Sequence, residues 1–152
     1  MHLIDCFIEL FGYVSYMNKA LPGEQPGFDR VKTDIAQLIT RNQATCQSSS
    51  FSREDFELAQ FAVFAWIDET ILNSSWQEKP SWQSEQLQRT YFQTADAGEL
   101  FFEKLNMLQP HQTEVREVFY VCLSLGFTGR YCNPGDEILL NQLRSSNLKL
   151  LT

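Results

Sequence analysis

The sequence predicts an all-α fold of about seven helices in a single domain that spans residues 1–152. Apolar residues recur at spacings of three and four along most of the chain, which is typical of helices with one buried face. No segment shows the alternating pattern of a strand. Proline, glycine and serine interrupt the apolar segments at short intervals, and this favours a bundle with short loops.

The first two predicted helices each carry one apolar stripe. The first covers about residues 2–19 and places on its inner face Leu3, Phe7, Leu10, Val14 and Met17. A loop rich in proline and glycine follows at 21–27. The second helix runs from about Phe28 to Cys46, with Val31, Ile35, Leu38 and Ile39 facing inward, and the serines at 48–50 end it.

The third predicted helix lies at the centre of the bundle. Ser52 and Asp55 form a start that resembles a capping box. Residues 61–67 are apolar on every side of the helix, so all of its faces should be buried. The helix should end near Asn73.

A polar stretch around Lys79 and Pro80 separates this helix from the second half of the chain. A short helix that includes Leu87, Tyr91 and Phe92 comes next.

Three further helices complete the prediction. Asp96 and Glu99 indicate a capping box at the start of the first, which Pro110 ends. The second begins at Thr113 and finishes just before Gly126. For the last helix, residues 133–136 indicate Asn133 at the N-cap, a proline at the first helical position and a carboxylate at the third position.

Charge and cysteine content exclude several classes of function. The net charge is −7, with 19 acidic and 12 basic side chains, so the chain lacks the basic surface of a nucleic-acid-binding protein. The four cysteines have no CxxC spacing and only two histidines occur, which argues against a zinc site and favours reduced thiols. Motifs for phosphate binding or a nucleophilic serine are missing. We therefore expect no catalytic residues, cofactor or metal.

The chain also lacks the run of about 20 apolar residues that a transmembrane helix needs. The apolar N-terminal segment contains Asp5 and Glu9, and no basic region precedes it. It is therefore not a signal peptide.

Asp68 and Glu69 directly follow the apolar run, near the end of the third helix. Carboxylates at a helix C-terminus oppose the helix dipole, so local stability does not explain them. One interpretation is an internal ion pair, for instance with Arg130. The other is an acidic patch that docks a partner. Catalysis by this pair is disfavoured, because neighbours on one helix diverge by about 100°.

Trp76 and Trp82 flank the polar stretch after the third helix. Large aromatic side chains commonly close the end of a small bundle, which is one role for this pair. The alternative is an interface, since exposed tryptophan is favoured at binding hot spots.

A series of motifs in a fixed order resembles the cytoplasmic domain of the DotU/TssL family. Its segments are FAWIDE at 64–69, the two tryptophans, AGELFF at 97–102 and CLSLGFTGRY at 122–131. The resemblance covers about residues 1–150. It implies a hook-like pair of helical bundles and a structural role in type VI secretion, or in the related Dot/Icm type IV systems, rather than an enzyme.

The resemblance also implies partners and sites. Family members associate with a TssM/IcmF-like membrane protein and with baseplate components such as TssK and TssE, at the cytoplasmic face of the bacterial inner membrane. Partner contact is then expected at Asp68 and Glu69, in a cleft shaped by Arg130 and Tyr131. Trp76 and Trp82 are added as partner-binding candidates on the hot-spot argument above.

Family members usually end in a single transmembrane helix, and residues 1–152 contain no such anchor. The resemblance allows a homodimer of the full-length protein. The alternative function is a small-ligand-binding protein or enzyme that uses a cleft near Asp68, Glu69 and Arg130.

Overall fold

The computed structural model describes residues 1–47 and 49–152, and the described chain is helical without any strand. Its first half contains the 3₁₀-helix η1 (Leu3–Phe7), α1 (Ile8–Ala20), α2 (Phe28–Gln47), α3 (Arg53–Leu72) and α4 (Lys79–Ser84). Its second half contains α5 (Leu87–Phe92), α6 (Ala97–Met107), α7 (Thr113–Ser124) and α8 (Asp136–Leu151). The all-α prediction is confirmed.

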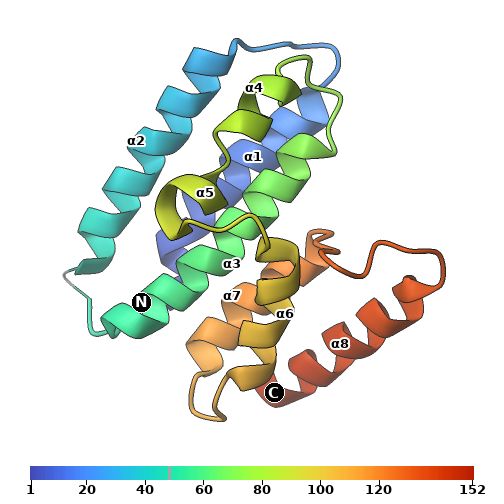
Figure 1. Cartoon of the computed structure of the whole chain (residues 1–152). Helices are drawn as coiled ribbons and strands as arrows, with labels where there is room; N and C mark the ends of the chain where they lie inside the picture. The colour runs from blue at the N-terminus through green and yellow to red at the C-terminus, as the bar shows by residue number, and fades with distance from the viewer. Residues whose placement is uncertain (48) are drawn as a thin grey trace.

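Helix α3 is the axis of the domain. Every residue from Phe61 to Asp68 is buried, and α3 packs against η1, α1, α4, α5, α6 and α7. Figure 1 shows α1, α2, α4 and α5 gathered around α3, with α6, α7 and α8 as a second group beside it. The two groups give the hook-like pair of bundles that the resemblance implied.

Helix ends follow the predicted chemistry in two places. The Ser52 side chain accepts a hydrogen bond from Asp55 N at 3.1 Å and caps α3. At the end of α7, Gly126 has a φ of +103°. There Phe127 N donates to Cys122 O and Gly126 N to Leu123 O, which is a Schellman motif.

Other boundaries differ from the predictions. The first helix is divided into η1 and α1, and α4 forms where a polar stretch was expected. The last helix begins at Asp136, because Gly135 has a φ of +92° and turns the chain at the N-cap. Ser48, part of the expected serine linker, lies outside the described residues.

The capping box predicted at Asp96 and Glu99 is wrong. Asp96 occupies the N-cap without a side-chain hydrogen bond. The Gln88 side chain accepts from Ala97 N at 3.0 Å and so caps α6 from a neighbouring helix. Glu99 instead lies 3.5 Å from Arg130.

The prediction of reduced thiols is wrong for one pair of cysteines. Cys6 in η1 and Cys46 in the last turn of α2 form a disulfide, with Cα atoms 6.2 Å apart. A separation of 40 residues gave no sign of this pairing. Cys122 and Cys132 are free thiols, the first buried and the second exposed.

None of the described helices is both long and apolar enough to cross a membrane.

Asn42 is a buried polar residue with an unsatisfied hydrogen-bond donor. It lies on the buried face of α2, and within the described chain its Nδ2 atom has no hydrogen-bond partner. A buried unsatisfied donor costs about 1–3 kcal/mol. We therefore expect Asn42→Leu to raise the free energy of unfolding by about 1 kcal/mol in urea denaturation.

Asn147 provides the matched control for this prediction. It is equally buried, but its side chain accepts from Arg116 Nη1 at 2.6 Å and donates to Leu143 O at 2.8 Å. Asn147→Leu should destabilise the protein, because it leaves Nη1 of the buried Arg116 guanidinium without its acceptor. A loss of stability in both variants would show that Asn42 is satisfied in solution.

Candidate functional site

The paired carboxylates near the end of α3 form the centre of the candidate site. Asp68 and Glu69 are adjacent in sequence, so their side chains leave the helix about 100° apart. Each side chain accepts hydrogen bonds from a different part of the chain. The pair therefore joins three separate segments rather than presenting one acidic surface.

Asp68 holds the α4–α5 region. Its Oδ1 accepts from the indole Nε1 of Trp82 at 2.9 Å and from Leu87 N at 3.0 Å. Its Oδ2 accepts from Gln88 N at 2.9 Å. Leu87 and Gln88 are the first two residues of α5, whose own N-cap residue, Gln86, makes no side-chain cap. Asp68 thus caps α5 from another helix.

The Asp68 side chain is only 1% exposed. Burial raises its pKa to about 6, and the hydrogen bonds from Gln88, Leu87 and Trp82 act in the opposite direction. All its donors among the described residues lie inside the domain, so the carboxylate is not part of the exposed surface. It acts by positioning α5.

Glu69 holds the loop between α7 and α8. Its Oε2 accepts from Thr128 N at 2.9 Å, and its Oε1 accepts from Gly129 N at 2.8 Å and from Thr128 Oγ1 at 3.2 Å. Consecutive backbone N–H groups that converge on one anion form a nest, a preferred environment for a carboxylate. This half-buried side chain fixes the loop beside α6.

The loop also packs directly on the start of α6. Arg130 N donates to Gly98 O at 3.2 Å, and a Cβ on Gly98 would lie 3.3 Å from Gly129 Cα. The absence of side chains at both glycines lets the two backbones approach. Two segments of the motif series, around 97–102 and 122–131, therefore meet at this contact.

Arg130 and Tyr131 both pack on Phe102 of α6. The Arg130 guanidinium lies 5.4 Å from the centre of the Phe102 ring, and the Tyr131 ring is 4.7 Å from it in an edge-on arrangement. Arg130 also lies 3.5 Å from Glu99. The internal ion pair proposed between Arg130 and the α3 carboxylates does not form among the described residues. Arg130 pairs with Glu99 of α6 instead.

Trp76 and Trp82 are each 1% exposed. The Trp76 indole donates to Pro26 O at 2.8 Å, and its ring lies 6.4 Å from those of Phe28 and Trp82. The two tryptophans close the end of the first bundle over the α1–α2 loop. A partner that docks on this face would touch their neighbours rather than the indoles.

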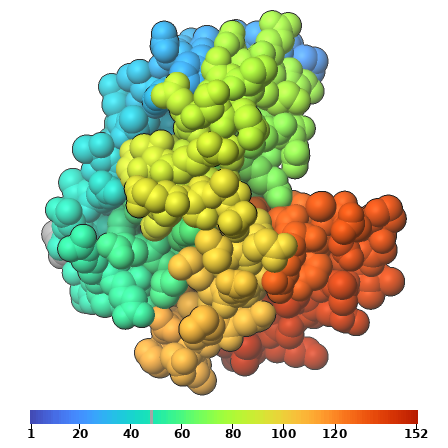
Figure 2. Space-filling view, in the orientation of Figure 1, coloured from blue at the N-terminus to red at the C-terminus, as the bar shows by residue number. Residues whose placement is uncertain are grey.

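Three residues near the buried carboxylates and tryptophans are partly or largely exposed: Glu99, Arg130 and Leu125. The Glu99 side chain is 60% exposed and that of Arg130 is 28% exposed. Leu125, at the end of α7, is 47% exposed. Figure 2 shows the lobe formed by α8 and the preceding loop set off from the α3–α4 region by an indentation. The exposed residues of the site therefore lie on an open surface.

Five hollows on the described surface lie away from the paired carboxylates. None of these five is lined by Asp68, Glu69 or Arg130.

Sequence reasoning missed two residues of the site. Gln88 connects Asp68 to α6 through its backbone N and its side chain, and no pattern in the sequence singles it out. Gly98 was noted only inside the AGELFF segment, where its partner on the α7–α8 loop could not be seen.

Comparisons with known proteins agree with the motif series. Residues 2–152 match the family described as type VI secretion system protein DotU. The cytoplasmic domain of TssL from Acinetobacter baumannii is 29% identical, with a TM-score of 0.88 over 99% of this chain and 97% of that one. T6SS SciP/TssL from enteroaggregative Escherichia coli 042 is 28% identical, with a TM-score of 0.66 over 98% and 87% of the two chains. No curated protein matches the sequence.

Proposed function

This chain belongs to the DotU family of type VI secretion system proteins, and from that premise we propose that it is a docking domain at the cytoplasmic face of the inner membrane. In this proposal it binds a TssM/IcmF-like membrane protein and baseplate components such as TssK and TssE. The match over residues 2–152 is the observation that carries the proposal.

The docking surface in this proposal consists of the α7–α8 loop, the exposed start of α6 and the end of α3. Glu69 holds this loop in one conformation through its bonds to Thr128 and Gly129. Asp68 fixes α5, whose Gln88 side chain caps α6. The two carboxylates therefore support partner binding by positioning the surface, and Glu99 and Arg130 provide its exposed charges.

Charge reversal at Glu69 and at Glu99 tests the surface. We expect Glu69→Lys to weaken capture of at least one of the three named partners by about tenfold or more, since a lysine cannot accept from the loop amides. Glu99→Lys changes only an exposed charge beside Arg130, and should weaken the same capture by a smaller factor. Affinities would be measured with purified proteins at physiological salt.

Glu57→Lys is the matched control. It reverses an exposed carboxylate on the same helix, about 18 Å from Glu69 along the axis. Helical circular dichroism should be unchanged in all three variants. Capture that survives both Glu69→Lys and Glu99→Lys would exclude this surface as the docking site. Asp68 is unsuitable for charge reversal, because a buried lysine at that position would unfold α5.

A further inference from the structure

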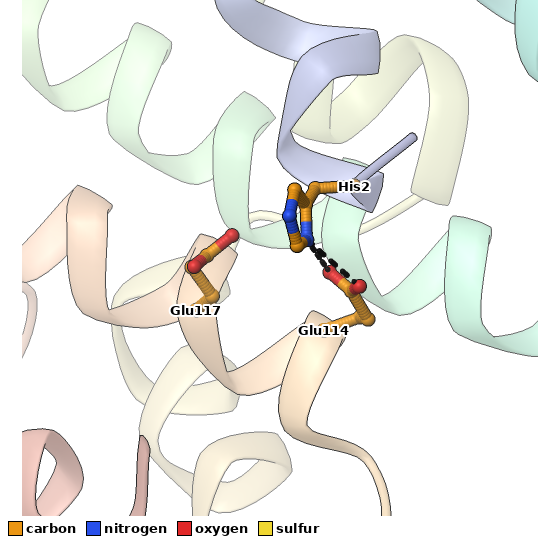
Figure 3. A group of neighbouring side chains, drawn as sticks. All are labelled: His2, Glu114 and Glu117. Atoms are coloured by element: carbon orange, nitrogen blue, oxygen red, sulfur yellow. Dashed lines mark hydrogen bonds and ion pairs between the residues drawn. The ribbon is translucent and has the colours of Figure 1, made fainter. Parts of the chain in front are cut away.

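A histidine and two glutamates from distant parts of the chain meet on the opposite side of α7 from α8. His2 precedes η1, whereas Glu114 and Glu117 lie one turn apart on α7. One ligand atom of each lies within 4.8 Å of the other two. Figure 3 shows the Glu117 carboxylate turned toward the imidazole, on the side away from Glu114.

The His2 imidazole, whose side chain is 70% exposed, is joined to α7 by Glu114. His2 Nδ1 lies 3.0 Å from Glu114 Oε1, and Glu114 Oε2 accepts from Leu3 N at 3.3 Å. Leu3 is fully buried where η1 packs on α7. Because the Glu114 carboxylate is an acceptor, Nδ1 carries hydrogen, and in the neutral imidazole the lone pair is then on Nε2, on the side of Glu117.

This arrangement matches the way proteins prepare a histidine for a metal ion. A ligating imidazole almost always donates its other N–H to a carboxylate or a carbonyl, which fixes the ring and raises its basicity. Here Glu114 takes the orienting role, and Glu117 supplies a second ligand beside Nε2.

The local charge favours a cation. In the described part of the chain, neither glutamate pairs with a lysine or arginine, and the half-buried Glu117 has no hydrogen bond or ion pair at all. Two carboxylates one helical turn apart repel each other when nothing lies between them. A dication at this point would remove that repulsion.

We propose that His2, Glu114 and Glu117 form a binding site for a divalent transition-metal ion of the Zn²⁺, Co²⁺ or Ni²⁺ class. Imidazole with carboxylate suits these ions better than Mg²⁺ or Ca²⁺, which prefer oxygen ligands alone. A bound ion would tie the N-terminal segment to α7 and stabilise the folded domain by mass action.

Zn²⁺ titration of the full chain tests the site. Isothermal calorimetry on protein stripped with EDTA, in a Cys132→Ser background that removes the exposed thiol, should show saturable binding of one ion per chain. The melting temperature should rise with added Zn²⁺. His2→Ala and Glu117→Gln should each weaken binding by more than about tenfold, and Glu114→Gln by about tenfold.

Two surface variants serve as controls. His111→Ala removes the other histidine, which is exposed in the loop before α7, and Glu137→Gln removes an exposed carboxylate of α8. Both should bind Zn²⁺ as tightly as the parent protein. The proposal is overturned if binding does not saturate below the millimolar range, or if His2→Ala and Glu117→Gln bind as well as the controls.

Discussion

Replacing Gly129 with alanine is expected to destabilise the protein by about 4 kcal/mol. Gly129 has a φ of +52°, where a side chain costs about 1–2 kcal/mol. A Cβ here would also lie 2.6 Å from the backbone oxygen of Gly98 and 2.9 Å from the rings of Phe102 and Phe127. The loop would have to move away from α6, and the hydrogen bonds to Glu69 would be lost.

Gly126→Ala separates the cost of the positive φ from the cost of the steric clash. Gly126 also has a positive φ, of +103°, but no atom lies within 4 Å of the position that its Cβ would take. This variant should lose only the conformational part, about 1–2 kcal/mol. Urea unfolding of both variants measures the difference. Equal losses would mean that close packing between Gly98 and Gly129 contributes nothing to stability.

The parts of the fold that could be predicted from the sequence depend on residues close together in the chain. The buried run 61–67 predicted a central helix because no polar residue interrupts it. Gly126 predicted the end of α7 because a glycine one residue past a helix is the common way to reverse the chain. In both cases the physical cause lies within about one or two helical turns.

The parts that could not be predicted depend on partners far along the chain. Glu69 bonds Thr128 and Gly129 across 59 and 60 residues, and Cys6 bonds Cys46 across 40. The Asp96 side chain makes no cap, and Gln88 from another helix accepts from Ala97 N. Side-chain pairing of this kind follows from the packing of helices, which periodicity alone does not specify.

The sequence correctly indicated that Asp68 needs compensation at the end of α3, but it did not predict the groups that surround its carboxylate. Its position at a helix C-terminus does need compensation. The compensation comes from three N–H donors inside the domain rather than from a cation or a partner. A single sequence shows that an acidic residue is out of place, but not which donors surround it.

Asp68→Ala is the second substitution with a large expected effect. It leaves Trp82 Nε1, Leu87 N and Gln88 N without their acceptor in a region that water does not reach freely. Each buried unsatisfied donor costs about 1–3 kcal/mol, so we expect a loss of at least about 3 kcal/mol and the unfolding of the short helix α5. Urea denaturation and amide exchange at Leu87 and Gln88 would measure both effects. Normal protection of these amides in the variant would show that another group caps α5.

The pH dependence of stability tests the state of the same carboxyl group. Its pKa is raised by burial from 3.8 to about 6, so between these values the folded protein binds more protons at Asp68 than the unfolded chain does. The contribution of Asp68 to stability must therefore fall as pH rises from about 4 to 6, by roughly 3 kcal/mol for a shift of this size. Asp68→Asn cannot titrate, so the stability of the parent protein relative to this variant should decrease over that window. A relative stability that instead increases with pH would mean that the three donors outweigh burial and hold the pKa below its ordinary value.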